Sequence, residues 1–232
     1  MINNFYLQSI IKNKILTNRP LVSVVLGDSH SEMAVACLQL STLTKAHKVN
    51  GQGKNIFEAV ADGLHLQFKQ GLFSWWFNKR LVSNLVLPDS ILVVGNISLN
   101  DDIKISNLVL PVNFRCSSAS AWFNKVKNCL AENCNIICPD DSDMAKYLEK
   151  KNYHYLVTYG LSKKAKVGAE DPSEYQNGFR WKLLTDGKTL PMALNGIKSE
   201  RQIYNWLAAI ALARCAGSSL TSIISQFQTL VE

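Results

Sequence analysis

Five short, almost entirely apolar segments constrain the fold of this chain more than any other feature. They are rich in Val, Ile and Leu, have the length of single strands, and cover residues 21–26, 90–94, 107–112, 135–138 and 155–158. Strands buried on both faces have this composition, and helical or loop segments separate each from the next. The alternation predicts an α/β fold, with a mostly parallel sheet and helices on both faces.

The clearest unit of this pattern is the run 21–26, LVSVVL, which a tight turn and a helix over 32–44 follow at once. Further helices are expected over 119–133 and 142–151. Two extended runs, 179–184 and 189–194, flank Asp186-Gly187, a strong signal for a β-hairpin. Two C-terminal helices are expected over 199–216 and 222–230, the first ending at Ala216-Gly217. We expect two parts, an amphipathic helix over 1–20 and one domain over 21–232.

Composition and charge exclude several classes of protein. Hydrophobic residues make up 47% of the 232 residues and charged residues 19%, the balance of a folded globular chain. No apolar run approaches the ~20 residues that a membrane span needs, and the start lacks the apolar core of a secretory signal. We therefore expect a cytoplasmic protein, either free or as part of a membrane-associated assembly. The net charge of +7 permits an anionic partner without requiring one.

The six cysteines are expected to be reduced, because the chain has no secretory signal. The spacing of Cys129, Cys134 and Cys138 leaves a metal site as an alternative, but the second cysteine pair or histidines of a zinc site are missing. We favour small apolar side chains that fill the core around the strand 135–137. Neither a metal nor a bound cofactor is expected.

Three stretches, in order along the chain, carry a resemblance to a known family. They are Trp122–Lys127 leading to the strand that ends in Pro139-Asp140-Asp141, then Thr158-Tyr159-Gly160, and then the helix 201–211, RQIYNWLAAIA. They resemble motifs of the central, ATP-binding domain of the Mur ligases, which join amino acids to peptidoglycan precursors, and of their folylpolyglutamate relatives. The resemblance covers about residues 20 to 220 and implies a P-loop type of α/β fold.

The phosphate-binding loop of that family departs most from its pattern here. Such a loop reads Gly-Thr-x-Gly-Lys-Thr/Ser, in which backbone amides and the lysine neutralise the triphosphate and the hydroxyl holds Mg²⁺. The equivalent stretch of this chain is Gly27, Asp28, Ser29, His30, Ser31 and Glu32. Ser31 replaces the lysine, Glu32 replaces the hydroxyl, and Asp28 adds negative charge. A lost charge-assisted contact costs about 1.5–3 kcal/mol, so we do not expect ATP to bind in the usual way.

Other positions of the family's site are also changed. Where the resemblance implies a Mg²⁺-binding glutamate after a buried strand, this chain has Gly95-Asn96, and the histidine and asparagine of the later helix read Arg201-Gln202. Lys125 matches the lysine that the family carbamoylates, and Asn205 matches an adenine-contacting asparagine. We interpret both as relics of the ancestral site.

These changes predict a protein without catalytic activity, a scaffold or adaptor subunit that binds other proteins in a bacterial multiprotein assembly. A secretion-system coupling complex is one candidate, which no residue establishes. Trp and Arg are favoured interface anchors. The candidate contact residues are aromatic and basic side chains of one segment: Phe73, Trp75, Trp76, Phe77, Lys79 and Arg80. Burial of these aromatic residues under the sheet is the alternative.

Two other functions remain open. The chain could be half of an ATP-dependent amide ligase of the Mur type, with a partner chain that supplies the missing domains. Nucleic-acid binding ranks third, because Trp75, Trp76, Lys79 and Arg80 interleave stacking and cationic groups, whereas the lysines and arginines of the whole chain are dispersed among carboxylates.

Overall fold

The computed structural model describes residues 13–15, 17–28, 31–40, 43, 45–64, 87–99 and 103–231. These ranges form one nine-stranded sheet, in the order β2-β3-β1-β4-β5-β6-β7-β8-β9. Every neighbouring pair from β2 to β7 is parallel, and β7, β8 and β9 pair antiparallel. The predicted fold class, a mostly parallel sheet with a β-hairpin and C-terminal helices, is confirmed. The strands are β1 (Leu21–Leu26), β2 (His47–Asn50), β3 (Ser90–Gly95), β4 (Ile105–Val109), β5 (Leu130–Pro139), β6 (Leu156–Gly160), β7 (Val167–Tyr175), β8 (Gly178–Thr185) and β9 (Lys188–Asn195).

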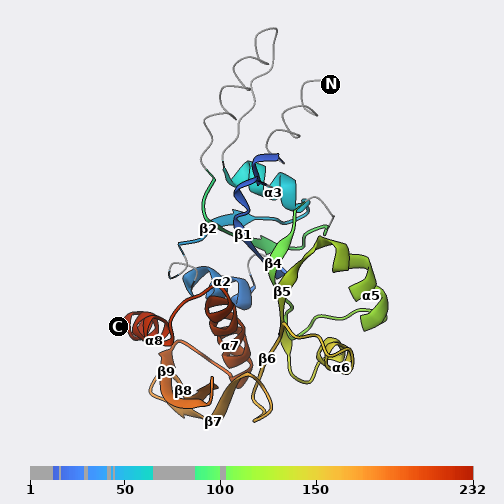
Figure 1. Ribbon diagram of the computed structural model, residues 1–232. Helices are drawn as coiled ribbons and strands as arrows, with labels where there is room; N and C mark the ends of the chain where they lie inside the picture. The colour runs from blue at the N-terminus through green and yellow to red at the C-terminus, as the bar shows by residue number, and fades with distance from the viewer. Residues whose placement is uncertain are drawn as a thin grey trace.

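Helices cover both faces of the sheet (Figure 1). On one face α2 (Glu32–Leu40), α7 (Glu200–Cys215) and α8 (Leu220–Val231) form a core with side chains such as Val25, Val94 and Val109. On the other face α3 (Ile56–Gly63) and α6 (Asp143–Lys150) bury Val24, Val93 and Leu108, and α5 (Ala119–Val126) packs against the same core. Neighbouring residues of each central strand thus enter opposite cores, because successive side chains of a strand point to opposite faces.

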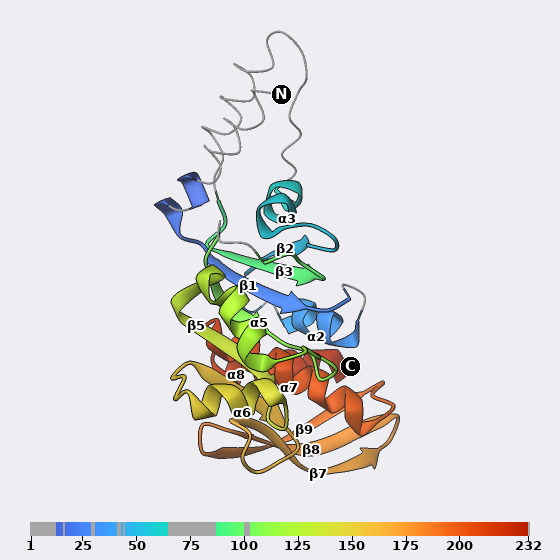
Figure 2. The ribbon, with the colours of Figure 1, turned by 90° about the vertical axis from the view of Figure 1, so that its right-hand side faces the viewer.

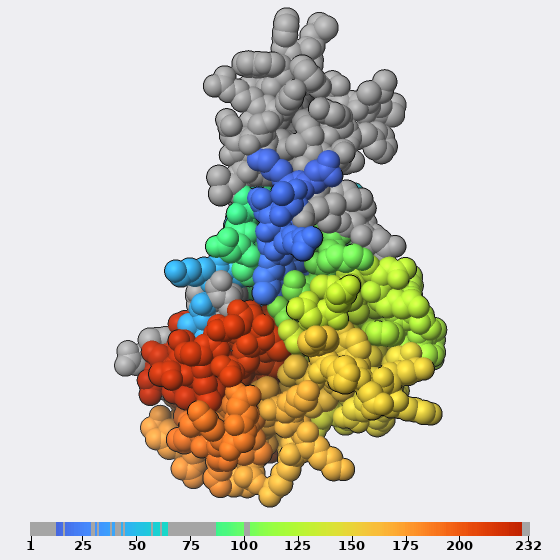
Figure 3. Space-filling model, in the orientation of Figure 1, coloured from blue at the N-terminus to red at the C-terminus, as the bar shows by residue number. Residues whose placement is uncertain are grey.

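The β-hairpin extends the sheet on the far side of β7. Asp186 and Gly187 connect β8 and β9 with φ of 51° and 71°, the left-handed pair that a tight two-residue hairpin turn needs. Trp181 and Leu194 of these strands are buried under the C-terminal helices, where the Trp181 and Trp206 rings each pack edge-on against Phe227. In the space-filling view, the C-terminal helices in red lie directly against the hairpin in orange (Figure 3).

Several boundaries differ from those expected. The helix predicted over 119–133 is wrong beyond residue 126: α5 gives way to a short 3-10 turn, Lys127–Cys129, and β5 starts at Leu130. The helix predicted over 32–44 corresponds to α2, Glu32–Leu40, and residues 41, 42 and 44 lie outside the described residues. Three elements were not predicted, namely β2, α3 and β7.

No helix within the described ranges is both long and apolar enough to span a membrane. Residues 1–12 of the predicted N-terminal helix lie outside these ranges, as does the whole predicted contact segment from Phe73 to Arg80.

Candidate functional site

A cavity of about 630 Å³ lies at the carboxyl ends of β1, β3 and β4, and we call it the strand-end cavity. Figure 2 shows the arrowheads of β1 and β3 pointing to this same edge of the sheet. Four segments line it, those that follow β1, β2, β3 and β4. Their described lining residues are Leu26, Gly27, Asp28, Gly53, Asn96, Ile97, Ser98, Pro111, Asn113, Phe114 and Arg115.

The strand order explains why a cavity forms here. After β1 the chain passes to α2 on one face of the sheet, and after the neighbouring β4 it passes to α5 on the other face. The two connections therefore separate above the carboxyl ends of adjacent strands. In open α/β sheets, ligands bind in the crevice at such a switch point.

Two glycines shape the edge of this cavity. Gly27 after β1 has φ of +128°, and Gly95 at the end of β3 has φ of +146°, both in the region that disfavours side chains. A Cβ on Gly95 would lie 2.7 Å from the Gln52 nitrogen. Residue 95 therefore cannot carry the acidic side chain that the family resemblance implies at this place, and Asn96 is the position that faces the cavity.

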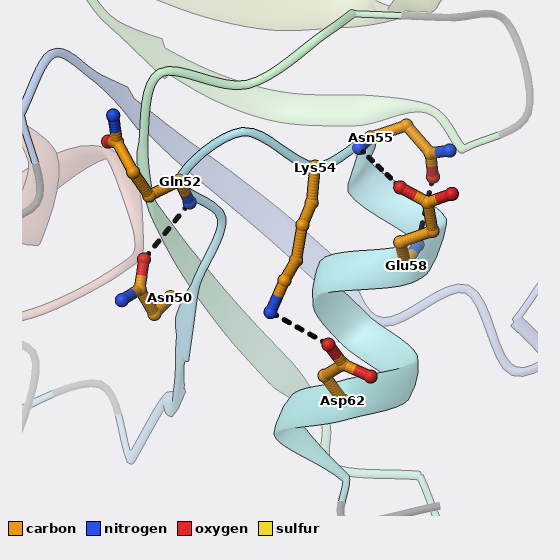
Figure 4. A network of polar contacts seen from close by, with 6 residues as sticks. All are labelled: Asn50, Gln52, Lys54, Asn55, Glu58 and Asp62. Atoms are coloured by element: carbon orange, nitrogen blue, oxygen red, sulfur yellow. Dashed lines mark hydrogen bonds and ion pairs between the residues drawn. The ribbon is translucent and has the colours of Figure 1, made fainter.

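The loop between β2 and α3 forms one wall and is held by its own polar contacts (Figure 4). The Asn55 side chain accepts a bond from the Glu58 amide at 2.8 Å, and the Glu58 carboxylate accepts one from the Asn55 amide, which is a capping box for α3. Lys54 points along α3 and pairs with Asp62 at 2.7 Å. The Gln52 side chain accepts a bond from the Asn96 amide at 3.1 Å, which joins this loop to the end of β3.

The opposite wall is the segment that follows β4. The Tyr159 hydroxyl, buried in β6, donates to the Leu110 carbonyl at 2.8 Å, and the Phe114 amide donates to the Pro111 carbonyl at 2.9 Å. The Phe114 ring packs edge-on against Trp122 of α5, with 4.9 Å between the ring centroids. These contacts set the position of Arg115.

A second cavity, of about 320 Å³, lies between α2, α7 and the segment after β9, and we call it the helix-pair cavity. Its walls combine apolar side chains with side-chain amides, a lining typical of small-molecule sites. The lining residues are Val35, Ala36, Gln39, Leu194, Asn195, Gly196, Ile197, Gln202, Asn205 and Trp206. Both cavities border the β1–α2 segment, the first before α2 and the second along it.

Only some of the predicted residues of the β1–α2 loop line a cavity. Gly27 and Asp28 line the strand-end cavity, whereas Ser29 and His30 lie outside the described residues. The Ser31 hydroxyl accepts a bond from the Ala34 amide at 3.2 Å and so caps α2, which Glu32 begins.

The two relic positions also differ. Asn205 lines the helix-pair cavity, but Lys125 is exposed on α5 and is not among the described lining residues of either cavity. The sequence did not point to Arg115 or Trp206. Residues 113–115 directly follow a predicted strand, the only signal that could have indicated them.

The buried cysteines do not form a nucleophilic site. Burial raises the pKa of Cys37, Cys134 and Cys138 to about 12, so these thiols stay protonated at neutral pH. Cys129, Cys134 and Cys138 pack in the core that α3 and α6 cover, among aliphatic side chains such as Ile136 and Leu148. This agrees with their expected role as core residues.

A comparison with known protein families bears on the helix-pair cavity. Residues 121–213 match the family model of the Mur ligase middle domain. The predicted resemblance to the central domain of the Mur ligases is confirmed. The matched range includes most of α5, all of β5 to β9 and most of α7, and therefore the Asn205 side of the helix-pair cavity. The sequence matches no curated protein.

Solved structures of ligases share the fold of this chain. MurF from Acinetobacter baumannii aligns over 97% of this chain and 49% of its own, with 14% identity and a TM-score of 0.60. MurF ligase from Thermotoga maritima in complex with ADP aligns over 97% and 52%, with 13% identity and a TM-score of 0.56. A variant of FPGS from L. casei aligns over 96% and 66%, with 10% identity and a TM-score of 0.56. The chain spans about half the length of the two MurF proteins.

These matches correct one prediction. We expected a protein that is not an enzyme, yet the matched family and the structural neighbours are ligases. That expectation is contradicted. The changed phosphate loop remains a fact of the sequence, and its effect on nucleotide binding stays a prediction.

Proposed function

We propose that this chain is the nucleotide-binding part of an ATP-dependent ligase of the Mur type, which joins a carboxylate to an amine. The observation that carries the proposal is the pair of cavities along the β1–α2 segment, in a fold that this chain shares with Mur ligases. Because the chain spans about half of the MurF proteins, the domains that bind the carboxylate and the amine would be supplied by other polypeptide segments.

The helix-pair cavity is suited to the nucleoside. Its volume is in the range of small-molecule sites, and its walls are largely apolar. Asn205 adds a side-chain amide of the kind that recognises a base, whereas the Gln202 oxygen already accepts a bond from the Lys198 amide. The MurF ligase from Thermotoga maritima, whose solved structure is a complex with ADP, has the same fold.

The strand-end cavity is suited to the phosphates and their metal ion. Asp28 is the one carboxylate among its described lining residues, with Ser98 and two asparagines as further oxygen donors. Mg²⁺ usually takes one or two carboxylates and completes its shell with phosphate oxygens and water. A single aspartate is therefore compatible with a nucleotide-borne Mg²⁺.

Isothermal titration of the purified protein with ATP and Mg²⁺, together with the shift in melting temperature, tests the proposal. We expect binding that Asn205→Ala weakens and that Asn124→Ala, on an exposed position of α5, leaves unchanged. Lys125→Ala should also leave the affinity unchanged. Absence of heat and of any melting shift at millimolar ATP would refute the proposal.

A further inference from the structure

Arg115 is the only cation among the described residues that line the strand-end cavity. Its side chain is exposed, and it faces a cavity whose other charged lining residue in the described ranges is Asp28. In this chain Ser31 stands where a phosphate loop has its lysine, so the positive charge for a phosphate must come from another segment.

Two described lysines on nearby segments, Lys54 and Lys104, do not face the cavity. Lys54 lies in the β2–α3 loop but pairs with Asp62 at 2.7 Å and points along α3, away from the ends of the strands (Figure 4). Lys104 precedes β4 and donates to the Asn128 carbonyl, which places it at the amino-terminal edge of the sheet.

Backbone amides cannot replace the missing charge on the β2–β3 side of the cavity. The Gly53 amide donates to the Asn96 carbonyl at 3.0 Å, the Ser98 amide donates to the Lys54 carbonyl at 3.0 Å, and the Asn96 amide donates to Gln52. Each of these donors already has an acceptor within the chain.

We infer that the Arg115 guanidinium binds the phosphate groups of a nucleotide in the strand-end cavity, in place of the lysine that the β1–α2 loop lacks. That the ligand is a nucleotide rests on the proposed function. That Arg115 binds its phosphate groups rests on the residues that line the cavity. A guanidinium presents paired N–H donors that match two oxygens of a phosphate, so an arginine from a neighbouring loop suits this task.

The contacts that hold the backbone next to Arg115 favour its role in phosphate binding. The Pro111–Phe114 turn and the contact between Phe114 and Trp122 fix the backbone next to Arg115. The side chain is therefore attached to a fixed segment, which reduces the ordering that binding requires.

Titrations of the wild type, Arg115→Ala, Arg115→Lys and Arg180→Ala with ATP and with pyrophosphate, in the presence of Mg²⁺, test the inference. Arg180→Ala is a control of equal charge, since Arg180 is exposed on β8, five strands from β1 in the sheet. Arg115→Ala should weaken both ligands about 10- to 100-fold, the range of a lost charged hydrogen bond. Arg115→Lys should restore part of the affinity. Added NaCl should reduce the difference in affinity between the wild type and Arg115→Ala.

The outcomes separate the inference from the proposed function. Equal affinity of wild type and Arg115→Ala, within about twofold, would overturn the inference while the ligase proposal stands. Pyrophosphate binding that depends on Arg115, without any binding of ATP, would support the phosphate site and refute the ligase proposal. No binding of either ligand by the wild type would overturn both.

Discussion

Replacement of Asn107 tests whether a buried chain of polar side chains holds the centre of the sheet together. Asn107 in β4 is 1% exposed, and its side-chain amide donates to the Ser23 hydroxyl of β1 at 3.0 Å. The side-chain oxygen of Asn107 accepts a bond from the side-chain amide of Asn135 in β5 at 2.8 Å. The three residues are direct partners in the strand registers, so the contacts link the strands on both sides of the switch point.

The magnitude follows from the burial of each partner. A buried hydrogen bond contributes about 1 kcal/mol net, and a buried group left without its partner costs about 1–3 kcal/mol. Ser23 is 4% exposed and would lose its donor, whereas half-buried Asn135 can turn to water. Asn107→Leu should therefore lower the free energy of unfolding by about 2–4 kcal/mol. Ser23→Ala alone should cost about 1–3 kcal/mol, because the buried side-chain amide of Asn107 loses its acceptor.

Urea unfolding followed by circular dichroism measures these changes. In the double variant Ser23→Ala, Asn107→Leu, the loss should be at least about 1 kcal/mol smaller than the two single losses added, because no unpaired hydroxyl remains. A loss below about 0.5 kcal/mol for Asn107→Leu, or strict additivity, would refute the reasoning.

Two further predictions concern the site edge and the core. Gly95→Ala should destabilise the protein by more than about 2 kcal/mol, because φ of +146° and the nearby Gln52 nitrogen both oppose a Cβ. Thermal unfolding measures this change, and an unchanged melting temperature would contradict the prediction. The pKa of about 12 for Cys37, Cys134 and Cys138, against an ordinary 9.0, means that the unfolded chain loses these protons first. Unfolding free energy should then fall between pH 9 and 12 by about 1.4 kcal/mol per pH unit per thiol. Urea titrations at pH 8 and 10 check this, and Cys37→Ala should flatten the slope.

The sequence predicted those elements whose local residue preferences match the structure that their tertiary contacts require. The central strands β1, β3, β4, β5 and β6 are buried on both faces and therefore appear as apolar runs. The hairpin was predicted because Asp186-Gly187 has the backbone preference of its turn.

The missed elements lack such agreement. The edge strand β2, with the sequence HKVN, is short and mostly polar, and only its pairing with β3 makes it a strand. The start of β5, LAEN, favours a helix, but the pairing of Leu130 with Ile105 overrides that preference. β7 contains Pro172 beside a register shift, a position where a sheet tolerates proline. α3 could have been found, because Asn55 and Glu58 have the spacing of a capping box.

The candidate site was less predictable than the fold because it depends on strand order. Asp28, Asn96 and Arg115 belong to three loops, and nothing local to these loops indicates that they share a cavity. They meet only because β1 lies between β3 and β4 and its outgoing connection takes the opposite face from that of β4. The phosphate-loop pattern concerns the β1–α2 loop alone, which is one of the four segments that line this cavity. A positive charge missing from that wall excludes phosphate binding only if no other wall supplies one, and Arg115 lies on another.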